Sequence, residues 1–318
     1  MTDSTAWQDL DAALEREYIV VREQPQSAGI SAFSAQSRTN GSEVGIKTVP
    51  AGIFAGTTAV SDADVAARRV QHPNIVSILG TGLQGDTFYW ISPAIDARTL
   101  RVRLSRGGRM DVQDSLTVLR DVSAALTHAH LHGVVHGGLS PDSVVISGGS
   151  ALVTDLGIPE VFAALRQQGV RASHATPSAA EPLRYASPEQ GSGGRADTRS
   201  DVYAWGVIAY ELLGGRHPFA GRSTPRQMMA AHADEEPPPL ATGPSGAPST
   251  VTRLVMRCLS KDPAKRPESA REILEVMTRE MLVPPKAAPA GSGQKLVIAL
   301  LIISVASIGL IAWLGMRS

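Results

Sequence analysis

The 318-residue chain has few features that would cross-link it or attract a polyanion. Cys258 is the only cysteine, so no internal disulfide can form, and this fits a reducing compartment. Because this cysteine lies in an apolar segment, we expect it to be a buried helix residue. The formal net charge is zero, and no long basic run exists. The composition therefore gives no support for a nucleic-acid partner.

The start of the chain also lacks a secretory signal, and the apolar run lies at the other end. Residues 1–14 contain acidic residues but no apolar core, so we expect a short leader there. Residues 296–314 are uncharged and strongly apolar, and a helix of this length spans about 28 Å, close to the hydrocarbon thickness of a bilayer. A buried soluble helix is the alternative, but a linker rich in Pro, Gly and Ser (283–295) precedes the run. We therefore expect a membrane span followed by a short tail, 315–318.

The charges beside this run indicate its orientation. Lys295 and Lys286 lie on its N-terminal side, and Arg317 is the only charged residue beyond it. This bias favours a large domain on the cytoplasmic face of the membrane. Only residues 315–318 would then emerge on the far side, so we do not expect a receptor that senses an external ligand through its own ectodomain.

The most informative segment is VVHGGLSPDSVVI at residues 134–146, followed by DLG at 155–157. It resembles the catalytic loop H-R-D-L-x-x-x-N and the downstream D-F-G triplet of the protein kinase family. The resemblance places Gly138 where the catalytic Asp stands, and Ser140 where many Ser/Thr kinases have a phosphate-contacting Lys. It places Ser143 at the second metal ligand, which is normally Asn. The motif is therefore recognisable, but three positions that normally carry its catalytic and metal-binding side chains hold other residue types.

Five further motifs follow the family order. They are VGIK at 44–47, HPNIV at 72–76, ASPE at 186–189, SDVYAWG at 200–206 and KDPAKRP at 261–267. The resemblance is to bacterial membrane-anchored Ser/Thr kinases and covers residues 15–282. It implies an α+β, two-lobed fold with a small, mostly β N-lobe (about 15–95), a larger helical C-lobe (about 96–282) and one C-terminal transmembrane helix.

Local patterns predict the elements of these lobes. Runs rich in β-branched residues and runs of helical periodicity mark them. We expect strands at 18–21, 44–49, 75–79, 88–92 and 134–135, and helices at 114–132, 200–213, 251–259 and 269–281. Three histidines, His128, His130 and His132, end the first of these helices, and we expect ordinary helix residues there rather than metal ligands.

The resemblance assigns possible nucleotide contacts. Lys47 would contact the phosphates of ATP, Asp155 would bind Mg²⁺, and Ile95 would lie in the adenine-contacting hinge. The usual Glu partner of the lysine falls near Ala63, and the glycine-rich loop is degraded because residues 22–31 contain one glycine. ATP and Mg²⁺ binding would therefore be weak. An exposed strand lysine and a hydrogen-bonding turn aspartate are the alternatives.

Four residues match the structural positions of the family. His136 frames the loop, Asp201 would tie the loop backbone to the central helix, and Glu189 would form a partly buried ion pair with Arg266. Ordinary surface charges are the alternative. Thr176, before Pro177 in a small-residue stretch, is a possible phosphorylation site for a partner Ser/Thr kinase, and a phosphopeptide-binding FHA-type protein would then recognise it. An unmodified loop is the alternative.

These features lead to one main hypothesis and two alternatives. The main hypothesis is a membrane-tethered pseudokinase that binds proteins as a regulatory or scaffolding module at the cytoplasmic membrane face. The first alternative is a weak or atypical Ser/Thr protein kinase that transfers the ATP γ-phosphate with Lys47, Asp155 and a relocated base. The second is a membrane adaptor that binds no nucleotide.

Overall fold

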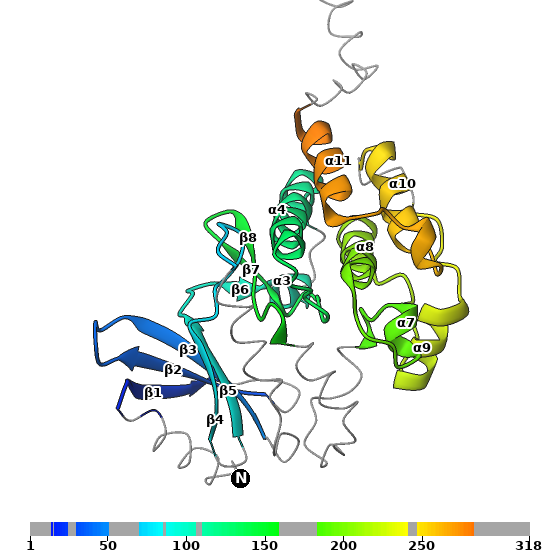
Figure 1. Cartoon of the computed structure of the whole chain (residues 1–318). Helices are drawn as coiled ribbons and strands as arrows, with labels where there is room; N and C mark the ends of the chain where they lie inside the picture. Colours follow the sequence, from blue (N-terminus) through cyan, green and yellow to red (C-terminus); the bar gives the residue numbers. More distant parts are fainter. Residues whose placement is uncertain are drawn as a thin grey trace, which may run out of the picture. The chain divides into compact units, whose positions relative to one another are not determined.

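The computed structural model describes residues 14, 16–24, 30–50, 70–84, 87–105, 110–158, 183–240 and 247–282. The chain divides into two units, Met1–Glu280 and Met281–Ser318. In the first unit, a twisted sheet lies to one side of a group of helices (Figure 1). The expected leader up to residue 13, the linker, the membrane span, the tail and Thr176 all lie outside the described residues.

A five-stranded antiparallel sheet forms the N-lobe. Its strands are β1 Tyr18–Gln24, β2 Ser31–Ser37, β3 Glu43–Pro50, β4 Gly80–Gln84 and β5 Thr87–Pro93, in the order β1-β2-β3-β5-β4. Alternate residues of β3, among them Val44 and Ile46, are buried on one face, as expected for a sheet with one covered side. The strands predicted at 18–21, 44–49 and 88–92 are confirmed, whereas β2 was not predicted.

The strand predicted at 75–79 is wrong. Ile75 forms an isolated parallel bridge with Val153 of the C-lobe, and strand pairing starts only at Gly80. Ile75, Val76 and Ile78 are nevertheless buried. The apolar run therefore reflects docking of this segment onto the C-lobe, where the Val76 amide donates to the Val153 carbonyl at 2.8 Å.

A second, three-stranded sheet includes the last residues of the 134–146 segment. It consists of β6 Arg98–Thr99, β7 Val144–Ser147 and β8 Ser150–Val153. Gly148 and Gly149 connect β7 to β8 with φ values of 56° and 84°, which a tight two-residue hairpin requires. The strand predicted at 134–135 is also wrong, because that segment lies in no strand; Val134 is buried as an apolar anchor instead.

Helices build the C-lobe. They are α3 Leu100–Ser105, α4 Val112–Leu131, α7 Pro188–Gly191, α8 Thr198–Gly214, α9 Pro225–Asp234, α10 Ser249–Cys258, the 3-10 turn η1 Pro263–Lys265, and α11 Ala270–Leu282. The four helices predicted from periodicity are confirmed as α4, α8, α10 and α11. Their ends follow local signals: the Asp111 carboxylate caps α4, Asp197 caps α8, and Gly215 ends α8 in the left-handed conformation.

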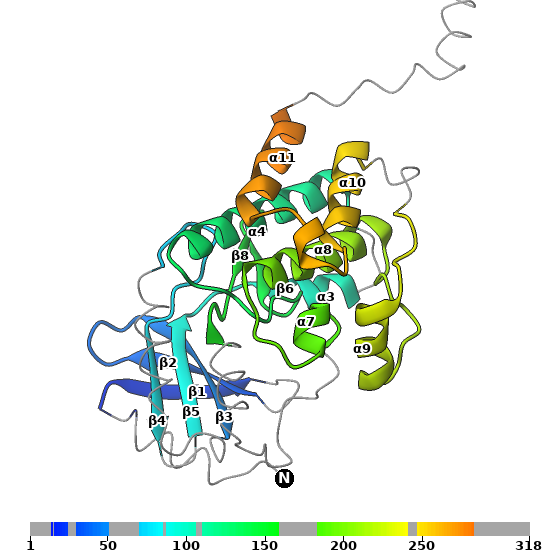
Figure 2. The same ribbon diagram turned by 45° about the vertical axis from the view of Figure 1, so that its right-hand side comes forward.

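Helix α8 is the centre of this lobe and packs against both α4 and α10 (Figure 2). Its Trp205 is fully buried and donates its indole N–H to the Leu119 carbonyl at 3.0 Å. Gly206 lets α10 approach closely, because a Cβ at that position would lie 2.7 Å from the Cβ of Cys258. This central helix gives the loop at residues 134–143 a rigid support.

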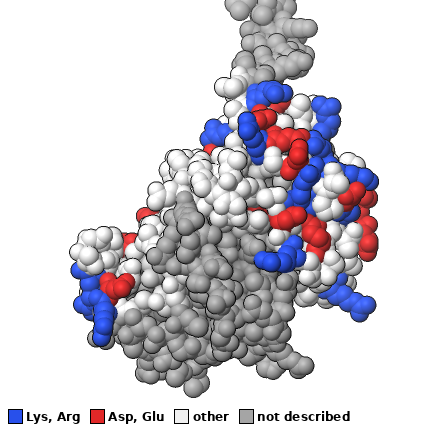
Figure 3. Space-filling view, in the orientation of Figure 1, with Lys and Arg blue, Asp and Glu red and all other residues white. Residues whose placement is uncertain are grey.

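Acidic and basic side chains intermingle on the face formed by the later helices (Figure 3). Arg257 pairs with Glu272, Arg271 with Glu275, and Arg222 with Glu235. In the part of the chain that the structure describes, no helix is both long enough and apolar enough to cross a bilayer.

Candidate functional site

The candidate nucleotide site centres on the carboxylate of Asp155, which follows β8. Lys47 on β3 donates to Asp155 Oδ2 at 2.6 Å, and Thr154 Oγ1 donates to the same oxygen at 3.0 Å. The backbone of Asp155 has a φ of 59°, a conformation that is uncommon for residues other than glycine. The structure therefore brings together the two residues to which the sequence assigned phosphate and metal contacts.

Trp90 completes this group, and the sequence did not indicate it. Its indole Nε1 donates to Asp155 Oδ1 at 2.8 Å. Trp90 lies on β5 directly opposite Lys47, and directly opposed residues of an antiparallel pair share one face of the sheet. The strand register, once known, is the signal that would have found it.

The surroundings keep Asp155 ionised. Burial by itself raises the pKa of its carboxyl, but the Lys47 ammonium and the hydrogen bonds from Lys47, Trp90 and Thr154 outweigh burial and lower the pKa below its usual value. The negatively charged Asp155 and the Lys47 side chain therefore neutralise each other within this group of residues.

The loop after Val134 provides no carboxylate at the expected position. Gly138 is exposed and has no side chain, and Gly137 before it has a φ of 74°. The Ser143 hydroxyl accepts from the Ser140 amide and donates to the Ser140 carbonyl, both at 3.0 Å. The Ser143 side chain is thus held within its own turn. The Ser140 hydroxyl accepts from the amide of Asp142 at 3.3 Å.

Asp142, the acidic residue next along this loop, points to another partner. Its side chain is 48% exposed and accepts from Arg101 Nε at 3.2 Å. Arg101 also donates to the Tyr185 hydroxyl at 2.9 Å, and Tyr185 donates to Glu211 at 2.5 Å. Asp142 therefore belongs to a network that ties α3 to the segment before α7.

Asp201 at the start of α8 holds the loop backbone. Its two carboxylate oxygens accept from the amides of His136 and Gly137 at 2.8 and 2.9 Å. His130 Nε2 lies 2.8 Å from the same carboxylate. Burial is the largest influence on His136 and lowers its pKa, so its imidazole is neutral. The sequence assigned Asp201 and His136 to the scaffold but did not indicate the contact with His130.

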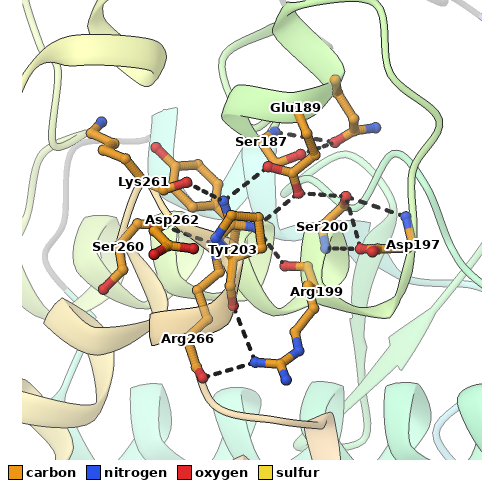
Figure 4. Close-up of polar contacts among 12 residues, drawn as sticks. Ser187, Glu189, Asp197, Arg199, Ser200, Tyr203, Ser260, Lys261, Asp262 and Arg266 are labelled. Atoms are coloured by element: carbon orange, nitrogen blue, oxygen red, sulfur yellow. Dashed lines mark hydrogen bonds and ion pairs between the residues drawn. The ribbon is translucent and has the colours of Figure 1, made fainter.

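Glu189 and Arg266 form the second scaffold contact (Figure 4). Arg266 is 1% exposed, and its Nη1 and Nη2 donate to the two carboxylate oxygens of Glu189 at 2.8 and 2.9 Å. Ser200 also donates to Glu189 at 2.8 Å. Although burial alone raises the pKa of Glu189, the hydrogen bonds from Arg266 dominate and lower it to about 2. The pair therefore fastens α7 to the residue that follows η1.

The remaining predicted positions are less informative. Ile95 lies in the connection after β5, is half-buried, and its carbonyl accepts from the Ala97 amide at 2.9 Å. The centre of the degraded glycine loop (25–29) and the position near Ala63, where the resemblance places the Glu partner of Lys47, lie outside the described residues. Across the described ranges, no group of three or more His, Cys, Asp or Glu residues could hold a metal ion.

Comparisons with known proteins support this architecture. Residues 28–277 match the family model for protein tyrosine and serine/threonine kinases. The Bacillus subtilis serine/threonine-protein kinase PrkC is 31% identical over 209 residues, which is 65% of this chain and 31% of that protein. Mycobacterium leprae PknB is 32% identical over 230 residues, 70% of this chain and 36% of that protein. The chain thus spans about a third of the length of these curated relatives.

A solved structure is similar in fold. The crystal structure of the Mycobacterium tuberculosis PknI kinase domain matches with a TM-score of 0.61 and 22% sequence identity, over 83% of this chain and 96% of that one. At this identity the likeness concerns the fold alone. The two-lobed arrangement expected from the motifs is therefore confirmed.

Proposed function

Because this chain belongs to the protein kinase family, we propose that it is a pseudokinase, a regulatory or scaffolding protein-binding module that does not transfer phosphate. The observation that carries the proposal is the composition of the loop at Gly138. No carboxylate stands there, and the nearest one along the loop, Asp142, is bonded to Arg101. A positioned general base contributes about 10²–10⁴-fold to such a reaction.

The second candidate is a serine/threonine protein kinase, and the comparisons by themselves favour it. The matched relatives are named serine/threonine-protein kinases, and members of this family generally use ATP and Mg²⁺. The specific observation that favours the kinase is that Lys47 and Asp155 are both present, with Lys47 Nζ 2.6 Å from Asp155 Oδ2. Phosphoryl transfer then needs a base other than residue 138.

A phosphoryl-transfer assay separates these functions. The full chain, kept in mild detergent because of its apolar run 296–314, is incubated with radiolabelled ATP and Mg²⁺ and a general protein substrate. We expect the same trace signal from the native chain and from Asp155→Asn. Transfer by the native chain that both Asp155→Asn and Lys47→Met abolish establishes the kinase instead. Bacillus subtilis PrkC serves as the positive control for the assay.

The same proposal includes a location and partners. The run 296–314 supports a single-pass tether with the preceding domain on the cytoplasmic face. Thr176 is the proposed site of phosphorylation by an active Ser/Thr kinase, and an FHA-type protein would then recognise the phosphorylated residue. Extraction from membranes by alkaline carbonate tests the tether: a chain that is released without detergent is not anchored. Mass spectrometry of the chain purified from cells tests phosphorylation at Thr176.

A further inference from the structure

The carboxylate of Asp155 is already surrounded by donors from the protein itself. Its Oδ1 accepts from the Trp90 indole, and its Oδ2 accepts from Lys47 and Thr154. We propose that Trp90 and Lys47 take the place of a divalent cation at Asp155. This group of residues therefore excludes Mg²⁺, and a nucleotide that binds there does so as a metal-free anion through Lys47.

These contacts conflict with the geometry of cation binding. Mg²⁺ requires oxygen ligands at about 2.0–2.1 Å in a nearly octahedral arrangement and gives up its waters reluctantly. A carboxylate has about four lone-pair sites, and three are occupied here, so an ion that reached Asp155 would find only the second lone pair of Oδ1, beside the Trp90 N–H, unless it displaced a donor. It would also place a double positive charge beside the Lys47 ammonium, which lies 2.6 Å from the same carboxylate.

The Trp90 indole cannot withdraw to make room. Trp90 is 2% exposed, and its ring stacks on Phe88 with a centroid distance of 5.9 Å. The ladder between β3 and β5 fixes its backbone opposite Lys47. The lysine has a flexible stem and can swing to a phosphate, but the indole has only its N–H to donate. If a cation took the carboxylate, the hydrogen bond from this buried N–H to Asp155 Oδ1 would be lost, which is costly.

Residue 143, where the resemblance places a second cation ligand, is already engaged. Its hydroxyl is held by both backbone groups of Ser140. Mg²⁺ sites with a single protein carboxylate do occur where phosphates complete the shell. The contacts of Trp90 and Lys47 with Asp155, rather than ligand number alone, therefore decide against the cation.

This inference rests on the proposed function, because a Mg²⁺-dependent kinase needs Asp155 for its cation. Its test is a titration of the full chain in mild detergent with Mn²⁺, which substitutes for Mg²⁺ and is followed by electron paramagnetic resonance. Trp90→Phe removes the N–H but keeps an aromatic ring. Trp205→Phe is the matched control, since it removes another buried indole N–H, the one bonded to the Leu119 carbonyl.

We expect no Asp155-dependent Mn²⁺ site in the native chain or in Trp205→Phe at concentrations up to about 1 mM. We expect Trp90→Phe to gain a site that Asp155→Asn removes in the same background. Mn²⁺ binding by the native chain that Asp155→Asn abolishes overturns the proposal. A folded Trp90→Phe that binds no more Mn²⁺ than the native chain also overturns it.

A second measurement covers a Trp90→Phe protein that does not fold. The affinity of the native chain for a fluorescent ATP analogue is compared in EDTA and in Mg²⁺. We expect the two dissociation constants to agree within about twofold, whereas a preference for Mg²⁺ of about tenfold or more overturns the proposal. If the analogue does not bind, the Mn²⁺ titrations of the native chain and Asp155→Asn decide alone. Neither readout measures phosphate transfer, so the proposed function can fail independently.

Discussion

Arg266 is the side chain whose removal should destabilise the fold most specifically. Its guanidinium has five N–H groups, and each of them finds an oxygen. Two reach Glu189, and the other three reach the carbonyls of Ser260, Arg199 and Lys261 at 2.8–3.0 Å. The ring of Tyr203 lies 4.9 Å from the guanidinium carbon. Arg266→Met therefore removes a charge from the centre of a fully bonded network (Figure 4).

The expected magnitude comes from the partner left behind. Breaking a buried ion pair by removing one member costs about 3–5 kcal/mol. Since the Glu189 side chain keeps 25% of its exposure, we expect the lower end, about 3 kcal/mol. For a domain of this size, 1 kcal/mol corresponds to about 2–4 °C of midpoint, so the thermal midpoint should fall by about 6–12 °C.

The assay is thermal and urea unfolding of the full chain in mild detergent. Arg257→Met is the matched control, because Arg257 and Glu272 form an exposed pair, 47% and 34% accessible, and such pairs contribute about 0–1 kcal/mol. Adding Glu189→Gln to Arg266→Met should recover part of the loss. Equal losses for Arg266→Met and Arg257→Met refute the reasoning, as does a double variant no more stable than Arg266→Met alone.

Three further predictions concern the C-lobe. Burial lowers the pKa of His217 to about 3 and of His232 to about 4. Below about pH 6.5 these two histidines are therefore protonated in the unfolded chain but not in the folded one, so stability falls as the pH falls. The urea midpoint should be constant above that pH and should decrease toward pH 4, and the decrease should be less steep in His217→Asn. The thiol of Cys258 is buried and its pKa is raised, so a thiol reagent at pH 8 should label the chain only in urea; labelling of the folded chain contradicts its burial. Gly206→Ala should cost about 1–3 kcal/mol in urea unfolding by overpacking, while Gly191→Ala, with nothing within 4 Å of the added Cβ, should cost less.

Elements whose signals are local could be predicted from the sequence. The helix at 114–132 was found because its apolar residues recur at helical spacing, and α8, whose start the SDVYAWG motif indicates, carries its own capping signal at Asp197. The segment at 75–79 shows where this approach fails. Ile75, Val76 and Ile78 are apolar and β-branched, as in a strand, yet they are buried without strand pairing, and the Val76 amide bonds to β8 instead. Hydrophobicity reports burial and does not report strand pairing.

The site was predictable only where one motif contains both the residue and its role. Asp201 and Arg266 lie in such motifs, and the structure brings each of them to an expected partner. Trp90 lies 65 residues from Asp155, and only the register of β5 against β3 places them together. The contact of Asp142 with Arg101 spans 41 residues and likewise depends on the packing of α3 against the loop.

The structural contacts of the C-lobe and the residues around Asp155 share one electrostatic property, which is that their charged side chains are bonded to groups of the chain itself. In the scaffold, Asp201 and Arg266 are bonded to groups of the chain itself. At the candidate nucleotide site, Asp155 is bonded to Lys47 and Trp90, and in the nearby loop Asp142 is bonded to Arg101. A site that stabilises the charge of a transferring phosphoryl group must hold its charges ready for that group. Here the charges neutralise one another, so binding any phosphate first requires breaking the contact between Lys47 and Asp155. That requirement is compatible with the proposed pseudokinase function.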